Sequence, residues 1–341
     1  MKFLHCADLH LDSPLINQNG ALRRKELLAS FKRAVDYAVN GSFDGVLIAG
    51  DMFDGEYVSQ DTFNAVVSIL SSAIKFFIVC GNHSKKDVYK RLADKTGDNV
   101  TFFLDDTFVS RTMGQVCIWG AELKENDNSS WSTFCPDPNF YNVVLLHCDD
   151  KNPAYGFFDK VALQQNKVDY VALGHLHAHT LYTIGKTKVC YSGALEPRGF
   201  DERSECGFVV LDTDKNSCTF LPFSTRKVET VSLDVSNVTC TLDLEKAVEK
   251  AVQKVDTANY LNLVLTGELQ HTIDVDQLNS TFKNRFFALR IENNTRLKID
   301  VKKLVTQNDV KGVFVSLVKD LDCADEILRL GIKALDGEKL C

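Results

Sequence analysis

The chain has 341 residues, long enough for one large and one small domain. Of these residues 45% are hydrophobic and 25% charged, values typical of a soluble globular protein. The formal net charge of -7 disfavours a protein that coats nucleic acid through a basic surface. It does not exclude a nuclease, because bound divalent cations reverse the field at the site where the substrate binds.

Short apolar runs alternate with amphipathic stretches in the first two thirds of the chain. We expect strands at 2–6, 45–49 and 76–80, and helices at 22–40 and 61–71. Continuous apolar strands between helices are typical of a sheet that is covered on both faces. Further apolar runs predict strands at 116–119, 142–146, 170–173, 189–191 and 208–211. Together they indicate a layered α/β sandwich over residues 1–225, with two central sheets flanked by helices.

The rest of the chain has a different rhythm. The pattern predicts a small α+β unit over residues 226–300 with the order β-α-β-α-β. Its expected elements are strands at 228–235, 260–266 and 288–293 and helices at 242–255 and 275–285. Residues 310–335 have the spacing of one or two amphipathic helices, so 301–341 is expected to be a C-terminal helical segment.

The cysteines and the N-terminal sequence bear on the compartment. The 11 cysteines are odd in number, form no C-x-x-C pair, and often lie in apolar runs, as Cys80 and Cys148 do. This is typical of reduced, buried thiols in a cytosolic protein. Charged and polar groups come too early for a signal peptide, and no apolar run reaches the roughly 20 residues that span a bilayer. We therefore expect a cytoplasmic protein without a membrane anchor.

Five segments share one feature, an apolar strand that runs directly into Asp, His or Asn. Side chains at strand ends are held rigidly and project into the crevice beyond the sheet. Each segment alone has an ordinary explanation as a turn or a structural histidine. Their joint occurrence, with five of the eight histidines, indicates a site. The residues are Asp8, His10, Asp51, Asp54, Asn82, His83, His147, His175 and His177.

Carboxylate, imidazole and amide donors suit manganese, iron, zinc or nickel rather than calcium. Seven donors are too many for one tetrahedral ion, but they suit two ions that share a carboxylate. Ions about 3.5–4 Å apart can clamp a phosphate and activate a water molecule. We expect two divalent ions, with manganese preferred, and the expected ligands are Asp8, His10, Asp51, Asn82, His147, His175 and His177.

These segments resemble the motifs of the calcineurin-like metallophosphoesterase family, which run D-x-H, G-D-x-x-D, G-N-H-[DE], H and G-H-x-H. The resemblance covers Asp8 to His177 and implies that Asp51 bridges two ions. It assigns Asp8, His10 and His177 to one ion, and Asn82, His147 and His175 to the other.

The same resemblance implies an acid for the leaving group. His83 would contact the phosphate, with Asn82, and protonate the leaving oxygen, and Asp54 would orient His83. Ser84 departs from the family pattern, which often has an acidic residue after G-N-H. That departure leaves the positioning of the loop open.

Two further strings, HCADLHLDSPL and YSGALEPRGFDE, resemble the DNA-repair exonuclease branch of the family, which includes SbcD-type and YhaO-type subunits. The resemblance implies DNA as substrate, a coiled-coil SMC-like ATPase as partner and a capping role for residues 226–300. A homodimer is a further expectation. Residues 310–335 could dock on the ATPase or pack on the cap.

Two alternatives to a DNA nuclease stay open. One is a phosphatase or cyclic-nucleotide phosphodiesterase on the same fold, and the other is a metal-binding scaffold without catalysis.

Several nearby residues have two interpretations. Arg198 could contact a substrate phosphate through both arms of its guanidinium, or pair with Glu196 or Glu202. Asp12 could hold a ligand histidine or cap a turn. We expect His5 to be structural, His179 to lie outside the ligand set, and His271 to lie on the surface.

Overall fold

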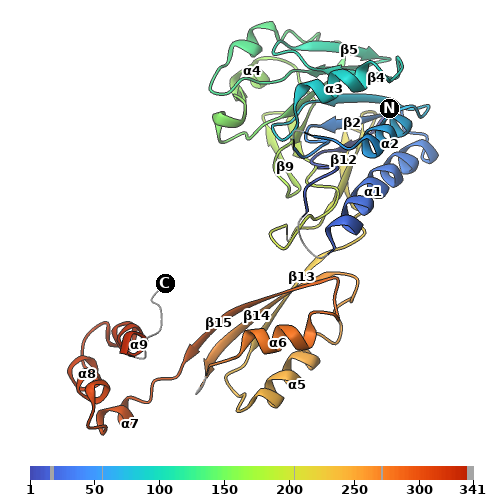
Figure 1. Cartoon of the computed structure of the whole chain (residues 1–341). Coiled ribbons are helices and arrows are strands. Elements are labelled where there is room, and N and C mark those ends of the chain that lie inside the picture. Colours follow the sequence, from blue (N-terminus) through green and yellow to red (C-terminus); the bar gives the residue numbers. More distant parts are fainter. Residues whose placement is uncertain (16–18, 56, 203, 270–271, 336–341) are drawn as a thin grey trace. The chain divides into compact units, whose positions relative to one another are not determined.

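The computed structural model describes residues 1–15, 19–55, 57–202, 204–269 and 272–335 (Figure 1). The chain divides into two compact units, Met1–Val228 and Glu229–Cys341. Within the described residues, no helix is both long and apolar enough to cross a membrane.

The first sheet of the first unit has six strands in the order β12-β11-β1-β2-β3-β4. The four strands from β1 to β4 are parallel, whereas β11 runs antiparallel to β1 and β12 antiparallel to β11. The strands are β1 (Lys2–Cys6), β2 (Gly45–Ala49), β3 (Lys75–Val79), β4 (Val100–Phe103), β11 (Gly207–Asp212) and β12 (Ser217–Pro222).

The second sheet also has six strands, in the order β5-β6-β7-β8-β10-β9. Its four inner strands are parallel, and the outer strands β5 and β9 are antiparallel to their neighbours. The strands are β5 (Val109–Met113), β6 (Val116–Gly120), β7 (Tyr141–His147), β8 (Tyr170–Gly174), β9 (Thr180–Ile184) and β10 (Thr187–Tyr191).

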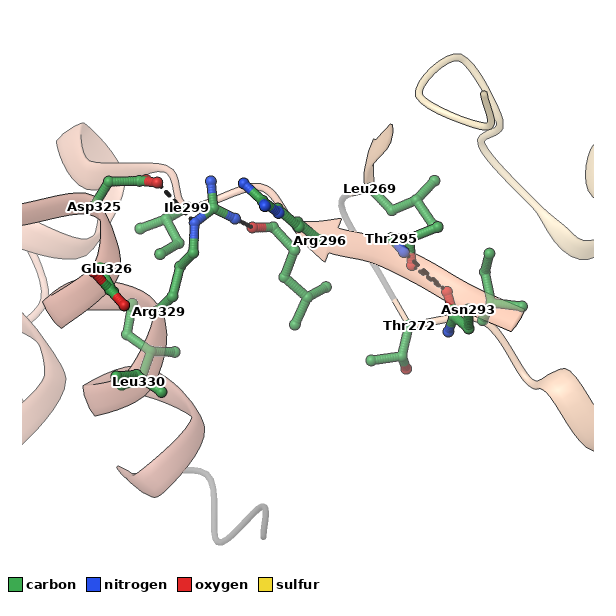
Figure 2. A pocket seen from close by; sticks show the side chains of 13 residues that line it. Leu269, Thr272, Asn293, Thr295, Arg296, Ile299, Asp325, Glu326, Arg329 and Leu330 are labelled. Atoms are coloured by element: carbon green, nitrogen blue, oxygen red, sulfur yellow. Dashed lines mark hydrogen bonds and ion pairs between the residues drawn. The ribbon is translucent and has the colours of Figure 1, made fainter. Parts of the chain in front are cut away.

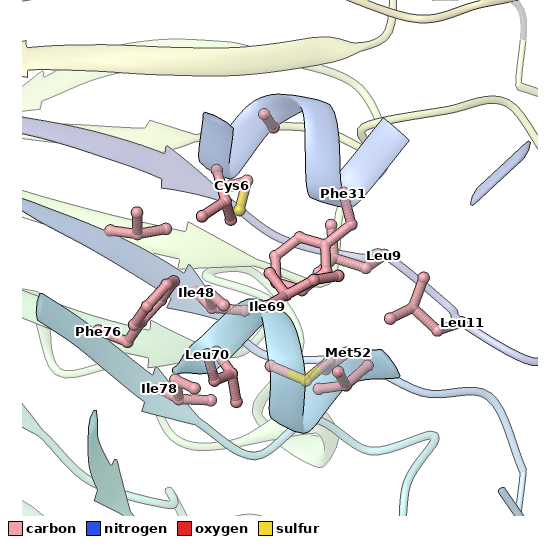
Figure 3. Close-up of a cluster of buried hydrophobic side chains, with 14 of the residues drawn as sticks. Cys6, Leu9, Leu11, Phe31, Ile48, Met52, Ile69, Leu70, Phe76 and Ile78 are labelled. Carbon is pink, nitrogen blue, oxygen red and sulfur yellow. The ribbon is translucent and has the colours of Figure 1, made fainter. Parts of the chain in front are cut away.

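The apolar core lies in three layers. Side chains of both sheets meet in one cluster, which includes Leu47 of β2 and Leu145 of β7. A second cluster, shown in Figure 3, joins the other face of the first sheet to the helices, with Phe31 and Ile69 packed near Ile48. A third covers the second sheet. The helices of this unit are α1 (Gly20–Asn40), α2 (Gln60–Leu70), α3 (Lys86–Ala93) and α4 (Lys160–Gln165), with short 3₁₀ helices at Ser129–Thr133 and Pro153–Tyr155.

The second unit contains a three-stranded sheet in the order β13-β14-β15, in which β14 and β15 are parallel. Helices α5 and α6 contribute Leu244 and Leu278 to its apolar core. Three further helices follow the sheet. The elements are β13 (Val228–Asp234), α5 (Thr241–Ala251), β14 (Tyr260–Leu269), α6 (Val275–Phe282), β15 (Ala288–Leu297), α7 (Val301–Val305), α8 (Val310–Val318) and α9 (Ala324–Leu335).

A cavity of about 730 Å³ lies in the second unit, beside the ends of β14 and β15 and helix α9 (Figure 2). Its walls combine apolar side chains such as Ile299 and Leu330 with Arg296 and Arg329. Arg329 pairs with Asp325 at 2.9 Å. None of the residues that the sequence assigns to the site lines this cavity, so it does not belong to the chemistry predicted there.

The predicted layered α/β sandwich with two sheets and a small C-terminal α+β unit is confirmed. All eight inner strands of the two large sheets were predicted, and the four edge strands β4, β5, β9 and β12 were not. The edge strands contain few fully buried residues, so they lack the continuous apolar run of an inner strand. Helix α3 was also missed. The finer division of the second unit at residue 300, and its capping role, remain proposals.

Candidate metal centre

The predicted site residues follow the carboxyl ends of strands in both sheets. Asp8 and His10 follow β1, and Asp51 follows β2. The two loops are joined through their backbones, because Asp8 N donates to Gly50 O at 3.2 Å and His10 N to Asp51 O at 2.9 Å. In the second sheet, His147 is the last residue of β7 and is registered with Gly174, the residue before His175. Parallel strands therefore deliver these side chains to one edge.

Four of these residues have left-handed backbone conformations. The φ angles are 52° for Asp8, 43° for His10, 46° for Asp51 and 97° for His175. Only eight non-glycine residues among those described have a positive φ. Such conformations are strained for L-residues and persist where the surrounding structure holds them, which is common at functional sites.

Glycines allow the strand ends to approach closely. A Cβ atom at Gly81 would overlap the Asp51 carboxylate, and one at Gly50 would overlap the His147 ring. A Cβ at Gly174 would overlap the carbonyl oxygen of Ala49. Each of these positions thus needs the absence of a side chain.

One group of donors consists of Asp8, His10 and His177, whose ligand atoms all lie within 4.8 Å of one another. Asp8 and His10 are buried. The Nε2 atoms of His10 and His177 are 3.2 Å apart. The Asp8 carboxylate also accepts from His175 N at 3.1 Å, which ties it to the loop of the second sheet.

A second group surrounds Asp51. Its Oδ2 lies 3.2 Å from His147 Nε2 and 4.0 Å from His10 Nε2, so this buried carboxylate contacts both groups. Asn82 Oδ1 lies 2.9 Å from His147 Nε2 and 3.2 Å from His175 Nδ1. All seven predicted ligands thus converge on one place.

The hydrogen-bond partners of two histidines indicate what this place can hold. His147 Nδ1 donates to Ala49 O at 2.8 Å, so Nε2 of the neutral ring carries a lone pair toward the oxygens of Asp51 and Asn82. His177 Nδ1 donates to Glu202 Oε1 at 2.7 Å, so its Nε2 likewise faces the centre. Acceptor atoms that face one another need a proton or a cation between them. The donor set fits divalent transition-metal ions.

The protonation equilibria differ among these residues. Burial opposes a charge on His147 and His177, but the hydrogen bonds with Asp51 and Glu202, respectively, outweigh it and raise the pKa of both rings, so a proton on His147 can also lie between its ring and Asp51. Burial, with the nearby charge of Arg198, lowers the pKa of His10 to about 2, so this ring is neutral and able to donate a lone pair. Burial alone would raise the pKa of Asp51, but its hydrogen bond and ion pair with His147 outweigh burial and lower it to about 2. Asp51 is therefore an anion at neutral pH.

His83 and Asp54 form a dyad at the rim of the centre. His83 Nδ1 lies 3.3 Å from Asp54 Oδ1, the side chain is 46% exposed, and the His10 ring centroid is 5.0 Å away. Asp54 also accepts from Ser13 Oγ at 2.6 Å. Ser84, the departure from the family pattern, donates to Phe53 O at 2.8 Å and so holds its loop against the loop of Asp54.

The structure distinguishes the interpretations of the neighbouring residues. Arg198 contacts Glu202 at 3.3 Å and Asp54 at 2.8 Å, so the expected ion pair is formed with Glu202, while Glu196 pairs with Arg23. Asp12 accepts from Ser59 N at 2.5 Å, at the start of α2, instead of holding a ligand histidine.

Two of the remaining histidines, His5 and His179, lie away from the ligand set. His5 is buried and contacts the Tyr170 hydroxyl at 2.9 Å, a structural position. His179 Nδ1 donates to Tyr191 O at 2.9 Å and stacks on Phe220. His271 lies outside the described residues.

Three contacts were not foreseen from the sequence. Glu202 contacts His177, Ser13 donates to Asp54, and the Tyr155 ring lies 4.5 Å from the His175 ring, measured between centroids. No local pattern marks these residues, because each reaches its partner through the tertiary fold. For Glu202, the only signal was its place in the string YSGALEPRGFDE.

The fold is a two-sheet sandwich whose strands end in carboxylates and imidazoles, a donor set that suits divalent metal ions. The chain belongs to the calcineurin-like phosphoesterase family, whose model matches residues 1–179, just over half of its length. It is thus a metal-dependent hydrolase of phosphoesters.

Two relatives bear on the branch of the family. The chain is 21% identical to the uncharacterized metallophosphoesterase YhaO of Bacillus subtilis, over 95% of this chain and 88% of that protein. It is 24% identical to the DNA double-strand break repair protein Mre11 of Methanosarcina mazei, over 62% of this chain. The match spans only 36% of that archaeal protein.

Among solved structures, TT1561 of Thermus thermophilus aligns with a TM-score of 0.43 and 13% identity. The alignment covers 64% of this chain and 96% of that one.

Proposed function

We propose that the protein is a two-metal phosphodiesterase that cleaves DNA, of the SbcD/YhaO type that acts in DNA repair. The observation that carries this proposal is the convergence of seven donors on one place, with Nδ1 of His147 bonded to Ala49 O and Nδ1 of His177 bonded to Glu202, so that the Nε2 atoms of both rings face the centre. Manganese is the proposed ion, and iron, zinc and nickel share the same donor preferences.

The proposed roles follow the two groups of donors. Asp8, His10 and His177 would hold one ion, and Asn82, His147 and His175 the other, with Asp51 shared between them. When bound, the ions supply Lewis-acid activation of the phosphate and of a water molecule.

The dyad supplies the proton for the leaving group. His83 lies at the exposed rim, where a phosphodiester can reach its ring, and protonates the departing oxygen. Asp54 orients the ring and stabilises its charged form, and Ser13 restricts Asp54. Asn82 and His83 are the proposed phosphate contacts.

DNA as substrate is supported by the name of one relative, the DNA double-strand break repair protein Mre11. The net charge of -7 provides no general attraction for DNA, so binding would depend on the centre itself. A small phosphoester as substrate is therefore the second candidate, and the same experiment distinguishes the two.

The test is hydrolysis by metal-stripped protein reloaded with manganese, on end-labelled linear DNA, a cyclic nucleotide and p-nitrophenyl phosphate. The wild type should degrade DNA, and His83→Ala should lose about 10²–10⁴-fold in rate while still binding two ions. His179→Gln, a histidine outside the centre, is the matched control.

Two outcomes would contradict the proposal. Hydrolysis of the small substrates alone would favour a phosphatase or cyclic-nucleotide phosphodiesterase. Two bound ions without hydrolysis of any phosphoester would favour a metal-binding scaffold.

A coiled-coil ATPase is the proposed partner. The side chains of Val310, Val313 and Leu317 in α8 are between 60% and 74% exposed, and they recur at the three- or four-residue spacing of a helix face. Such a stripe suits a coiled-coil surface. Leu317→Glu should abolish copurification with the ATPase, and unchanged copurification would argue that these helices pack within the cap.

Two further parts of the proposal concern the compartment and the oligomeric state. The ten cysteines of the described residues are free thiols, which supports a reducing compartment such as the cytoplasm. A homodimer remains a proposal to be tested by the protein's mass in solution.

A further inference from the structure

The ring of His177 is held from behind by Glu202. The His177 Nδ1 to Glu202 Oε1 distance is 2.7 Å, and the Glu202 side chain is only 13% exposed. A carboxylate in this position keeps the proton on Nδ1, aims Nε2 at the centre and makes the ring more basic as a ligand. Glu202 thus contacts the first group of donors without being one of them.

Arg198 joins Glu202 to the dyad. Its backbone N donates to Glu202 Oε2 at 2.7 Å, and its Nε lies 3.3 Å from Oε1 of the same carboxylate. Its guanidinium also donates to Asp54 Oδ2 at 2.8 Å. Asp54 in turn contacts His83. One continuous chain of contacts therefore runs through His177, Glu202, Arg198, Asp54 and His83.

The charges along this chain alternate. The Arg198 guanidinium lies between two carboxylates, and its side chain is only 20% exposed. A substrate phosphate would have to compete with both carboxylates for this guanidinium. The sequence offered a phosphate contact as one role for Arg198. This geometry instead favours a role in which Arg198 holds the residues of the centre in place.

We propose that Glu202 and Arg198 are positioning residues: Glu202 sets the affinity for the ion held by Asp8, His10 and His177, and Arg198 couples that side of the centre to the orientation of His83. The role of Glu202 concerns metal binding alone. The role of Arg198 rests on the proposed function, because it is expressed through the acid.

Glu202 is tested by calorimetric titration of the metal-stripped full-length protein with Mn²⁺. Glu202→Ala should lower the affinity for one of the two ions about 10–100-fold and leave the affinity for the other near its wild-type value. The affinity of Glu202→Gln should lie between those of the wild type and the alanine variant, because its amide oxygen still accepts from Nδ1–H but carries no charge. Glu205→Ala is the control, since Glu205 is 63% exposed and pairs weakly with Lys227 at 3.9 Å.

The result separates positioning from general stability. Unchanged affinity for both ions in Glu202→Ala, or an equal loss of both, would overturn the proposal. If the alanine variant does not fold, as judged by circular dichroism, the glutamine variant decides the question by the same criteria. This titration is independent of any activity, so it remains informative even if no phosphodiester is cleaved.

Arg198 is tested by steady-state kinetics with Arg198→Met, which keeps the aliphatic bulk and removes both ion pairs. A positioning role predicts at least a 10-fold lower kcat with KM changed less than 3-fold, on the order expected for partial loss of acid catalysis. Arg198→Lys should recover part of kcat, because an ammonium can satisfy one carboxylate. A raised KM with unchanged kcat would instead indicate a phosphate contact and overturn this part.

Discussion

At the scale of single residues, the centre depends on backbone positions that few residues can occupy. Asp8, His10, Asp51 and His175 have φ angles between 43° and 97°. Each such conformation costs about 1–3 kcal/mol, so other contacts of the fold must offset it. The hydrogen bonds from Asp8 N to Gly50 O and from His10 N to Asp51 O are two of these contacts. Strained backbone conformations and glycines that allow close approach therefore occur in the same loops.

Gly81→Ala should damage the centre although position 81 offers no ligand. The added methyl group would overlap the Asp51 carboxylate and push the shared carboxylate from its place. We expect about a 10-fold or greater loss of Mn²⁺ affinity for both ions by titration, because Asp51 contacts both groups. Gly199→Ala is the matched control, since a Cβ there meets nothing within 4 Å. Wild-type affinity in Gly81→Ala would contradict the close packing.

His5 should make the stability depend on pH. Burial lowers the pKa of its ring to about 3, against 6.5 in an unfolded chain. Between these values the unfolded state binds a proton that the folded state does not, so the stability that is present above pH 6.5 falls as the pH falls. The loss from this residue should approach 1.4 kcal/mol per pH unit, or about 2 kcal/mol between pH 8 and pH 5.

The check is urea denaturation of metal-stripped protein at several pH values, for the wild type and for His5→Gln. The free energy of unfolding of the variant should fall less steeply with decreasing pH, because all other histidines are common to both proteins. Parallel pH curves would show that His5 has the same pKa in the folded and unfolded states and would contradict this prediction.

At the scale of elements, a buried ion pair fastens the segment after β10 to helix α1. Arg23 of α1 is fully buried and lies 2.5 Å from Glu196. The other oxygen of Glu196 accepts from Ser30 Oγ at 2.6 Å and from Thr225 N at 2.5 Å. Arg23 also donates to Pro197 O at 2.7 Å. Since Arg198 comes next in the chain, this anchor holds the backbone from which Arg198 and Glu202 reach the centre.

Glu196→Ala should destabilise the protein by up to about 3–5 kcal/mol, because it removes one of the two carboxylates that pair with the buried Arg23 charge and leaves only Glu26, at 3.0 Å. The double variant Arg23→Met, Glu196→Leu should recover much of that loss, since no charge is left unpaired. Denaturant titration gives both values. Asp36→Ala, which breaks the exposed Lys32–Asp36 pair, is the control and should cost less than about 1 kcal/mol. Equal effects of Glu196→Ala and Asp36→Ala would argue against the anchor.

At the scale of the whole molecule, the chain consists of two compact units with separate apolar cores. All seven expected ligands lie in Met1–Val228. The cavity of about 730 Å³ lies in the other unit and shares no residue with the centre. Metal binding should therefore stabilise only one of the units.

Differential scanning calorimetry should resolve two transitions, of which only one shifts upward with Mn²⁺. At a metal concentration of 100 times Kd, that transition should gain about 2.7 kcal/mol per independent ion. Chelation by EDTA should reverse the shift and leave the second transition unmoved. Equal shifts of both transitions would mean that the units unfold together.

The sequence by itself determined the inner strands and the polar residues at their ends. Continuous apolar runs such as Gly45–Ala49 are local patterns, and the residue that follows each run is read directly from the chain. Edge strands such as β5 and β12 were missed, because exposure on one side removes that pattern. Ser84 was recognised as a departure, but its bond to Phe53 was not.

Only the tertiary structure decided how the centre is held together. Arg198 and Asp54 are 144 residues apart, and Arg23 and Glu196 are 173 apart. Periodicity and spacing carry no information on such pairs, since a hydrogen bond between distant residues forms only when the packed sheets and helices bring them within about 3 Å. The side chains that would bind metal are thus evident in the sequence, whereas the side chains that aim them appear only after folding.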